Sequence, residues 1–304
     1  MRAAAALAAA LALAGCRADA SIGDASGVLF GAAAATATAD EAAQEAALIA
    51  LEGETGRTFD LDRIYHQWDT AVPGVREQWT LDAGRIPIVS FKASSDVPWP
   101  ALARGDAEPR LAAIAAAYRA LAAPVFCIFD QDPENSGGAL GTPADFAAAY
   151  RHIVLAFRAA GATNVTWIFN LKSPSYPHLA DQYYPGDDVI DWLGASAYNF
   201  GVASGGRWVS FADLLTDFVA WATPHGKPLI VTEWASTEDP ADPARKATWI
   251  TDAARAVHDL PQIRAISAYW SMVDGNRFDS SPRSLAAFQA FAQDPYTHLR
   301  DPAR

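Results

Sequence analysis

Short apolar or β-branched runs alternate with longer alanine-rich stretches of helical periodicity along almost the whole chain. This alternation is typical of βα units built on a parallel sheet. No fixed-period repeat is visible, and no linker divides the chain after its first residues. The runs predict eight strands: Gly27–Gly31, Ile64–Trp68, Ile86–Phe91, Val125–Asp130, Val165–Asn170, Trp192–Tyr198, Pro228–Glu233 and Ile263–Trp270.

The stretches between the predicted strands contain helices. Thr142 before Pro143, for example, gives a cap followed by proline at the first helical position. Eight strands in one alternating chain of 304 residues fit a closed barrel better than two open sheets. The predicted fold class is therefore α/β, a single (β/α)8 TIM barrel over residues 27–300. The predicted helices are Asp40–Glu52, Pro109–Ala122, Pro143–Ala160, Phe211–Ala222, Pro243–Leu260 and Ser284–Ala292.

Composition limits the partners that such a barrel can have. Hydrophobic residues make up 51% and charged residues 19% of the chain, which is enough apolar material for a large core. The formal net charge of -12 is opposite in sign to what phosphate binding requires. We therefore expect neither nucleic acid nor anionic lipid headgroups as partners, and we expect a monomer.

The first residues have the pattern of an export signal. Met1-Arg2 is followed by an alanine and leucine run that ends in Leu13-Ala14-Gly15-Cys16. Residues 1–15 predict a signal peptide, and its end resembles a bacterial lipobox, in which the cysteine is lipidated. We expect residues 16–26 to be the lipidated Cys16 and a tether, anchoring an exported lipoprotein in the cell envelope with no other membrane contact. The alternative is an ordinary signal peptide with an incidental cysteine.

Two carboxylates directly follow predicted strands on opposite sides of the barrel. Asp132 comes after the fourth strand and Glu233 ends the seventh. In a (β/α)8 barrel the carboxyl ends of the strands gather at one face, where catalytic residues lie. Paired carboxyls in one cleft are what glycoside hydrolysis needs. Glu134 is a second candidate for the acid at the fourth strand.

Aromatic residues accumulate near the same strand ends. A flat indole packs well on the face of a sugar ring, so these tryptophans are candidate sugar platforms; the alternative is that each fills space between sheet and helices. The six histidines are scattered without a HExxH pattern, so we expect no metal and no cofactor. Cys127 lies in an apolar run and is expected to be a buried, inert thiol. The candidate tryptophans are Trp68, Trp99, Trp208, Trp234 and Trp270.

Eight further segments of the chain are informative together: residues 63–68 (RIYHQW), 84–87 (GRIP), 103–105 (ARG), 161–167 (GATNVTW), 183–188 (YYPGDD), 191–192 (DW), 198–199 (YN) and 227–233 (KPLIVTE). They resemble glycoside hydrolase family 26, the family of retaining β-mannanases and related β-glucanases and xylanases. The similarity extends from about Gly27 to Ala292 rather than resting on one motif.

The resemblance implies a (β/α)8 fold, Glu233 as nucleophile and a general acid/base at the end of the fourth strand. The family usually has His-Glu there, whereas this chain has Gln131 and Asp132. Aspartate is one methylene shorter, about 1.5 Å of reach, and a misplacement of about 1 Å can cost on the order of a hundredfold in rate. The expected substrate-binding residues are Gln131, Tyr198, Trp270, Trp68, Trp234 and Asn199, with Tyr198 orienting the nucleophile.

Retaining hydrolysis of a β-linked polysaccharide, mannan-type or a related β-glycan, is the leading hypothesis. The shortened acid at Asp132 also suggests a catalytically weakened, carbohydrate-binding surface lipoprotein. A third hypothesis is an enzyme that processes the cell's own exported polysaccharide.

Overall fold

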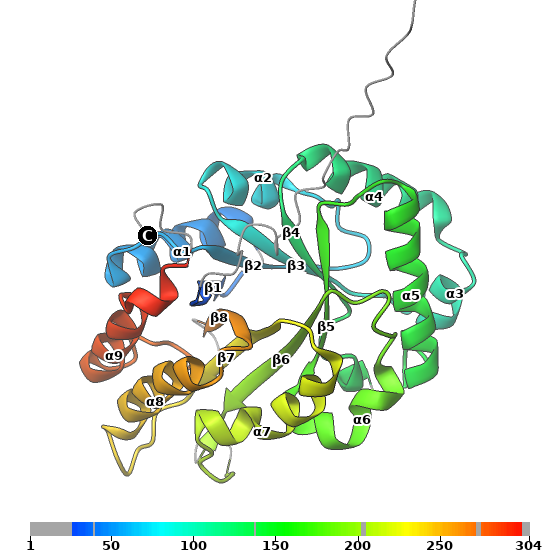
Figure 1. Ribbon diagram of the computed structural model, residues 1–304. Helices are drawn as coiled ribbons and strands as arrows, with labels where there is room; N and C mark the ends of the chain where they lie inside the picture. Colours follow the sequence, from blue (N-terminus) through cyan, green and yellow to red (C-terminus); the bar gives the residue numbers. More distant parts are fainter. Residues whose placement is uncertain (1–25, 39, 137, 202–204, 272–274, 300–304) are drawn as a thin grey trace, which may run out of the picture.

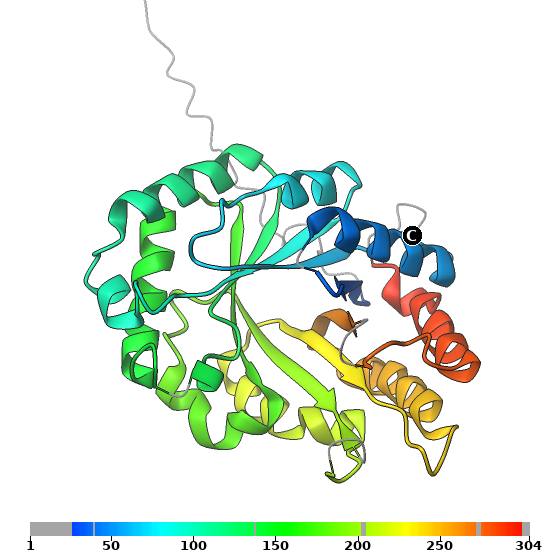
Figure 2. The ribbon, with the colours of Figure 1, turned by 180° about the vertical axis from the view of Figure 1, so that it is seen from behind.

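The structure, a computed structural model, describes residues 26–38, 40–136, 138–201, 205–271 and 275–299. Eight parallel strands pair in chain order, and β1 pairs with β8, so the sheet closes into a barrel. Figures 1 and 2 show the helices arranged around the outside of this ring. The predicted (β/α)8 barrel is confirmed. The proposed signal peptide, Cys16 and almost all of the tether lie outside the described residues and stay predictions.

Each predicted strand corresponds to one observed strand, and the ends differ by a few residues. The alanines after Gly31 continue the first strand, and the seventh strand extends three residues past Glu233. The strands are β1 (Leu29–Ala35), β2 (Leu61–His66), β3 (Ile86–Phe91), β4 (Val125–Phe129), β5 (Val165–Lys172), β6 (Trp192–Asn199), β7 (Leu229–Ser236) and β8 (Ile263–Ser271).

All six predicted helices are present, and the described residues contain three further short ones. Those three span only 8, 5 and 8 residues, too few for a helical period to be recognised with certainty in the sequence. Within the described residues, no helix is both long and apolar enough to cross a bilayer. The predicted helices are α1 (Glu41–Thr55), α4 (Glu108–Leu121), α5 (Pro143–Ala159), α7 (Phe211–Ala222), α8 (Arg245–Asp259) and α9 (Pro282–Ala292); the further ones are α2 (Val75–Asp82), α3 (Trp99–Ala103) and α6 (Tyr176–Tyr183).

The barrel interior changes character along the strands. Near the start of the strands the inward side chains form an apolar plug that includes Leu61, Ile88, Phe126 and Trp192. Because side chains alternate between the two faces of a strand, the next inward position on β2 after Leu61 is Arg63. The larger apolar core lies outside the ring, between the strands and the helices. Above this plug, toward the carboxyl-terminal ends of the strands, inward positions carry polar side chains such as Arg63 and Tyr65.

A buried ion pair fixes helix α2 against strand β2. The outward-facing Asp62 accepts two hydrogen bonds of 2.8 Å from Arg76, and Thr80 Oγ1 donates a third at 2.5 Å. The Asp62 and Arg76 side chains are 0% and 2% exposed. Since Asp62 is the neighbour of Arg63, this pair also fixes the strand that carries an inward guanidinium.

We predict that Asp62→Ala lowers the free energy of unfolding by about 3–5 kcal/mol, because it leaves the Arg76 guanidinium buried without its carboxylate. Reversible urea denaturation followed by circular dichroism measures this change. The control is Asp106→Ala, which removes an exposed partner of Arg104 and should change stability little. Equal stability of the two variants would show that the buried pair does not anchor α2.

Candidate active site

Glu233 points into the barrel because β7 contains one extra residue. Between Val231 and Glu233 the pairing of β7 skips a residue relative to β6, and the register with β8 shifts over the same segment. Such a β-bulge interrupts the inward and outward alternation of side chains. Thr232 and Glu233 therefore both bond to inward side chains, while Trp234 points into the outer core.

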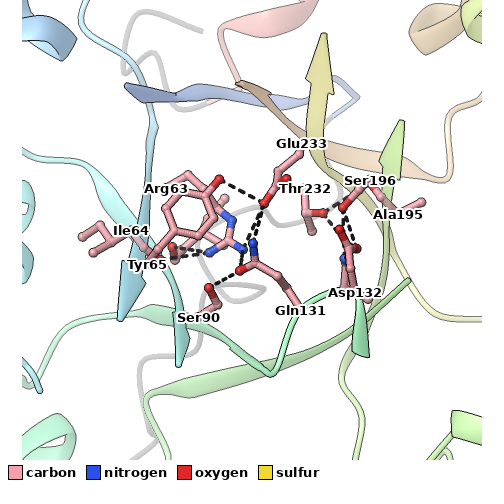
Figure 3. A network of polar contacts seen from close by, with 12 residues as sticks. Arg63, Ile64, Tyr65, Ser90, Gln131, Asp132, Ala195, Ser196, Thr232 and Glu233 are labelled. Carbon is pink, nitrogen blue, oxygen red and sulfur yellow. Dashed lines mark hydrogen bonds and ion pairs between the residues drawn. The ribbon is translucent and has the colours of Figure 1, made fainter. Parts of the chain in front are cut away.

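The Glu233 carboxylate accepts hydrogen bonds on both oxygens, and Figure 3 shows those that converge on Oε1. The Tyr198 hydroxyl donates to Oε2 at 2.5 Å, and the Tyr65 hydroxyl donates to Oε1 at 2.9 Å. The Gln131 amide donates to Oε1 at 3.2 Å, and an Arg63 guanidinium nitrogen lies 3.4 Å from the same oxygen. Two phenols, an amide and a cation thus hold the carboxylate in a single orientation while it is 4% exposed as a residue.

The two phenols remain donors over the whole working range of pH. Burial, followed by the negative charge of Glu233, raises the pKa of Tyr65 and of Tyr198 well above the usual value for tyrosine. A phenol that keeps its proton stabilises an ionised carboxylate next to it.

Gln131 is held by the same network from its other end. Its Oε1 accepts a hydrogen bond from Arg63 Nη2 at 2.7 Å and a short one from the Ser90 hydroxyl. These donors fix the orientation of the amide, so that its nitrogen faces Glu233. Arg63 also donates to the carbonyl oxygens of Ile64 and Ile88, and it is buried completely beneath the site.

Asp132 lies on the other side of Thr232 from this network (Figure 3). Its Oδ1 accepts hydrogen bonds from Asn170 Nδ2 at 2.9 Å and from the Ser196 hydroxyl at 3.0 Å. The Asn170 amide oxygen accepts a 2.5 Å hydrogen bond from Thr232 Oγ1. A continuous chain of hydrogen bonds therefore joins Asp132 to the residue that precedes Glu233.

The carboxyl group of Asp132 keeps its proton at neutral pH. Burial, followed by the charges of Glu233 and Glu134, raises the pKa of Asp132 to about 8. Because Oδ1 already accepts two hydrogen bonds, the proton resides on Oδ2. The site thus pairs a proton-bearing carboxyl with a carboxylate held by phenols.

The backbone around this acid is left-handed. Asp130 has φ 49° and Asp132 has φ 48°, on either side of Gln131. Such conformations disfavour most side chains, and aspartate is among the residues that tolerate them. The Asp130 carboxylate is buried and accepts a 2.6 Å hydrogen bond from Trp99 Nε1, and its pKa is raised to about 6, chiefly by burial.

Glu134 belongs to the neighbouring turn rather than to the cavity. Its Oε1 accepts a 2.8 Å hydrogen bond from the backbone nitrogen of Lys172 at the end of β5. Its Oε2 is buried without a hydrogen-bond partner among the described residues. Glu134 therefore acts on Asp132 through its charge.

A cavity of about 510 Å³ opens over Glu233. This volume lies within the range of small-molecule sites. Glu233, Tyr65, Tyr198 and Gln131 line it, whereas Asp132 does not. The remaining lining residues are Ala35, Phe200, Tyr269 and Asn276.

The tryptophans predicted as sugar platforms do not line this cavity, and their assignment is corrected. Trp234 is fully buried against Trp249 and Phe278 in the outer core, and Trp68 packs on Phe91. Trp270 pairs with an outward-facing alanine of β1 and donates its indole N–H to an aspartate outside the ring. The physical reason is strand alternation, which turns the neighbouring Tyr269 inward.

Three further predicted residues do not line the cavity and instead make contacts within the fold. Trp99 is buried against Asp130, and Trp208 lies beneath the Arg245 guanidinium. The Asn199 amide donates to Ser236 Oγ and accepts from the Val209 backbone, and it is 1% exposed. Asn199 therefore joins β6 to β7 and to the end of the following loop, just before α7, and its assignment to substrate binding is corrected.

Six residues of the network were not among the predicted site residues: Arg63, Tyr65, Ser90, Asn170, Ser196 and Thr232. Arg63 is a charged residue at an inward strand position, where branched apolar residues dominate in such barrels. Its position in the sequence is the signal that could have pointed to this network. Burial raises the pKa of the Cys127 thiol, as suits an inert side chain. Within the described ranges, no group of three or more histidine, cysteine or acidic side chains could hold a metal ion.

The chain is a (β/α)8 barrel with Asp132 just after β4 and Glu233 on β7. No family model matches the chain. Among solved structures, the fold resembles the catalytic domain of the family 26 endo-β-1,4-mannanase of Bacillus sp. JAMB-750, with TM-score 0.63, 16% identity, and coverage of 91% of this chain and 89% of that one. The family 26 β-mannanase of Bacteroides ovatus matches with TM-score 0.62, 16% identity, and coverage of 89% and 90%.

A curated relative matches about half of the chain. Endoglucanase H of Acetivibrio thermocellus is 34% identical over 157 residues, which are 49% of this chain and 17% of that protein. The chain therefore spans less than a fifth of the length of this relative. The resemblance to glycoside hydrolase family 26 is confirmed at the level of the fold.

We predict that Glu233→Gln lowers the pKa of Asp132, because it removes the charge that opposes ionisation of the aspartate. Carbon-13 NMR of carboxyl-labelled aspartate, assigned with Asp132→Asn, measures this titration. Asp130 is the internal control, since its pKa is raised by burial and not by Glu233. An unchanged Asp132 titration would mean that the two carboxyl groups do not interact.

Proposed function

We propose that the protein is a glycoside hydrolase of the family 26 type that cleaves a β-linked polysaccharide with retention of configuration. The observation that carries this proposal is the pair of unlike carboxyl groups at the barrel mouth. Glu233 is an oriented carboxylate that faces a cavity, and Asp132 bears a proton at neutral pH. Retaining glycosidases use one carboxyl as nucleophile and the other as acid and then base.

In the first step, Glu233 attacks the anomeric carbon of the sugar in the cavity. Oε1 accepts from three donors and Oε2 from Tyr198, so Oε2 is the less saturated oxygen and is assigned the attack. Asp132 transfers its proton to the departing glycosidic oxygen as the bond to the anomeric carbon breaks. The product is a glycosyl ester of Glu233 and a free leaving-group sugar.

The second step uses the change in charge that the first step makes. Esterified Glu233 no longer carries the negative charge that raises the pKa of Asp132, and Asp132 has just lost its proton. Asp132 is then a carboxylate able to accept a proton from water. The resulting hydroxide attacks the anomeric carbon and releases Glu233 as a carboxylate.

Asp132 is favoured over Glu134 as the acid because of its contacts. Glu134 accepts a hydrogen bond from the Lys172 backbone, whereas Asp132 belongs to the hydrogen-bond chain that ends at Thr232, the residue before Glu233. The shorter acid supports a second candidate function, carbohydrate binding with weakened hydrolysis. Substrates of mannan type are proposed because the solved neighbours are named as endo-β-1,4-mannanases and mannan-active enzymes. Export as an envelope lipoprotein remains part of the proposal.

We predict that Glu233→Ala reduces hydrolysis of the responsive β-glycan by at least about 10³-fold, because the nucleophile is lost. Asp132→Asn should slow cleavage of oligosaccharides strongly, while sparing aryl glycosides whose leaving group needs no proton. Product analysis by proton NMR on β-1,4-mannan, β-1,4-glucan and β-1,4-xylan measures both the rate and the anomer first formed.

Retention of the β-anomer supports the double displacement, and an α-product would exclude it. Asp132→Glu is the matched variant for the second candidate function. Binding without cleavage in the native protein, with hydrolysis gained by Asp132→Glu, would establish the weakened enzyme instead.

We predict that kcat/KM falls as the pH rises through about 8, because Asp132 then loses the proton that the leaving oxygen requires. Because the pKa of Asp132 is raised in the folded state, ionisation of Asp132 destabilises the fold. Its contribution to the free energy of unfolding therefore falls as the pH rises from the ordinary aspartate pKa to about 8. A pH–rate profile on a mannan oligosaccharide measures the basic limb. A limb that is unchanged in Asp132→Glu and lies far from pH 8 would contradict the assignment of the acid.

A further inference from the structure

Consecutive side chains after β4 point in directions that an extended strand does not allow. The Asp130 carboxylate bonds to the indole of Trp99, which belongs to the outer core. The Gln131 amide and the Asp132 carboxyl group both bond to side chains inside the barrel. Neighbouring side chains of a strand alternate between its two faces. The chain therefore departs from strand geometry where the proposed acid is placed.

Strict alternation along β4 would give the opposite arrangement. Phe126 and Ile128 belong to the plug inside the barrel, while Phe129 belongs to the outer core. The next residue, Asp130, would then face inward and Gln131 outward. The left-handed backbone of Asp130, with φ 49°, reverses this order. This turn brings Gln131 and the residue after it into the barrel mouth.

The side chain of Asp130 fixes its own left-handed backbone. Trp99 Nε1 donates to Oδ2 at 2.6 Å, and the backbone N–H of Ala93 donates to the same carboxylate. The backbone nitrogen of Asp130 donates to the Phe91 carbonyl oxygen at 2.9 Å. Asp130 is thus tied to both ends of the segment that joins β3 to α3. A left-handed residue other than glycine is strained and persists only where its surroundings fix it.

Trp99 is a rigid anchor for this carboxylate. Its side chain is fully buried and packs edge to face on Phe146 of α5 and on Tyr183 of α6, with ring centroids 5.3 and 6.4 Å away. Its backbone nitrogen donates to the Leu140 carbonyl oxygen at 2.9 Å. Because these contacts fix the indole, they also fix the carboxylate that it binds.

The bonds to Asp130 are made to a charged group at neutral pH. Burial raises the pKa of Asp130, but only to about 6, so the side chain is then a carboxylate. The positive charge of Lys92 and the donors Trp99 and Ala93 favour this ionised form. Hydrogen bonds to an ionised acceptor are stronger than those to a neutral one. The turn is therefore held by strong bonds from a rigid donor.

We propose that Asp130 is the positioning residue of the general acid, and that its bond to Trp99 holds the left-handed turn which places Asp132 in the barrel mouth. The same turn directs the Gln131 amide toward Glu233. This inference rests on the proposed function, because it concerns the acid of that reaction. Asp130 does not line the cavity, so it acts through the two residues that follow it.

The test separates proton donation from the rest of the reaction. We measure kcat/KM with whichever β-1,4-linked tetrasaccharide of mannose, glucose or xylose the native protein cleaves, and with the dinitrophenyl glycoside of the same sugar, whose leaving group needs no proton. Asp130→Gly permits the left-handed backbone and removes the carboxylate, and Trp99→Phe removes the N–H donor. Each should lower kcat/KM for the tetrasaccharide about 10- to 100-fold, the effect of a small misplacement of the acid. Each should change kcat/KM for the aryl glycoside less than about 3-fold.

Two further variants separate positioning from a general loss of structure. Asp130→Asn keeps an acceptor for Trp99 and tolerates the left-handed backbone, so it should retain kcat/KM within about 3-fold. Asp181→Ala is the matched control, because Asp181 on α6 accepts a 2.7 Å hydrogen bond from the Trp221 indole on α7. It should leave kcat/KM for both substrates unchanged.

The titration of Asp132 tests the same placement without any cleavage. If the turn is no longer held, Asp132 leaves its buried position, and its pKa should fall toward the ordinary aspartate value. We expect this fall in Asp130→Gly and in Trp99→Phe, and not in Asp181→Ala. Carbon-13 NMR of carboxyl-labelled aspartate measures it.

Failure of the positioning role and failure of the hydrolase proposal give different results. If the native protein cleaves none of the glycans but Asp130→Gly and Trp99→Phe lower the pKa of Asp132, the hydrolytic function fails and the positioning role stands. The positioning role is overturned if both variants leave that titration unchanged, or if they slow both substrates equally. It is also overturned if Asp130→Asn loses as much activity as Asp130→Gly.

Discussion

The hydrogen bonds that converge on Glu233 are the constraint on which the rest of the site depends. A carboxylate this deeply buried is costly unless donors replace its water, and Tyr198, Tyr65 and Gln131 supply them. Arg63 brings the compensating charge from beneath. Tyr198 lies on β6, Tyr65 and Arg63 on β2, and Gln131 just after β4, so these strands must be assembled correctly before the carboxylate is satisfied. The fold and the environment of the proposed nucleophile are therefore coupled.

The second carboxyl group differs from the first because its surroundings differ. Asp132 accepts hydrogen bonds from one amide and one hydroxyl group, and two negative charges lie nearby. Among the described residues, no phenol or guanidinium is bonded to the Asp132 carboxyl group, and Lys172 acts on it through its charge alone. These surroundings raise the pKa of Asp132, as the proposed role of a general acid requires.

Much of the fold and part of the site follow from sequence. Alternation of apolar runs and helical stretches predicts all eight strands, and the position of Asp132 and Glu233 after strands predicts that they share one end of the barrel. The inward or outward direction of single side chains was less accessible. Trp270 has the type of side chain expected of a sugar platform, yet the neighbouring Tyr269 is the residue that lines the cavity. The bulge at Thr232 leaves no mark in composition, because it is fixed by pairing with β6 and β8.

Because of that bulge, the side chains of both Thr232 and Glu233 face the inside of the barrel. If the full sequence of β7 paired without this bulge, the strand would retain its partners on both sides and its apolar character. Strict alternation would then send the acidic side chain into the aromatic layer beneath the helices and bring the following indole over the cavity. A change in strand pairing alone would thus replace the carboxylate over the cavity by an indole, without changing the amino-acid sequence.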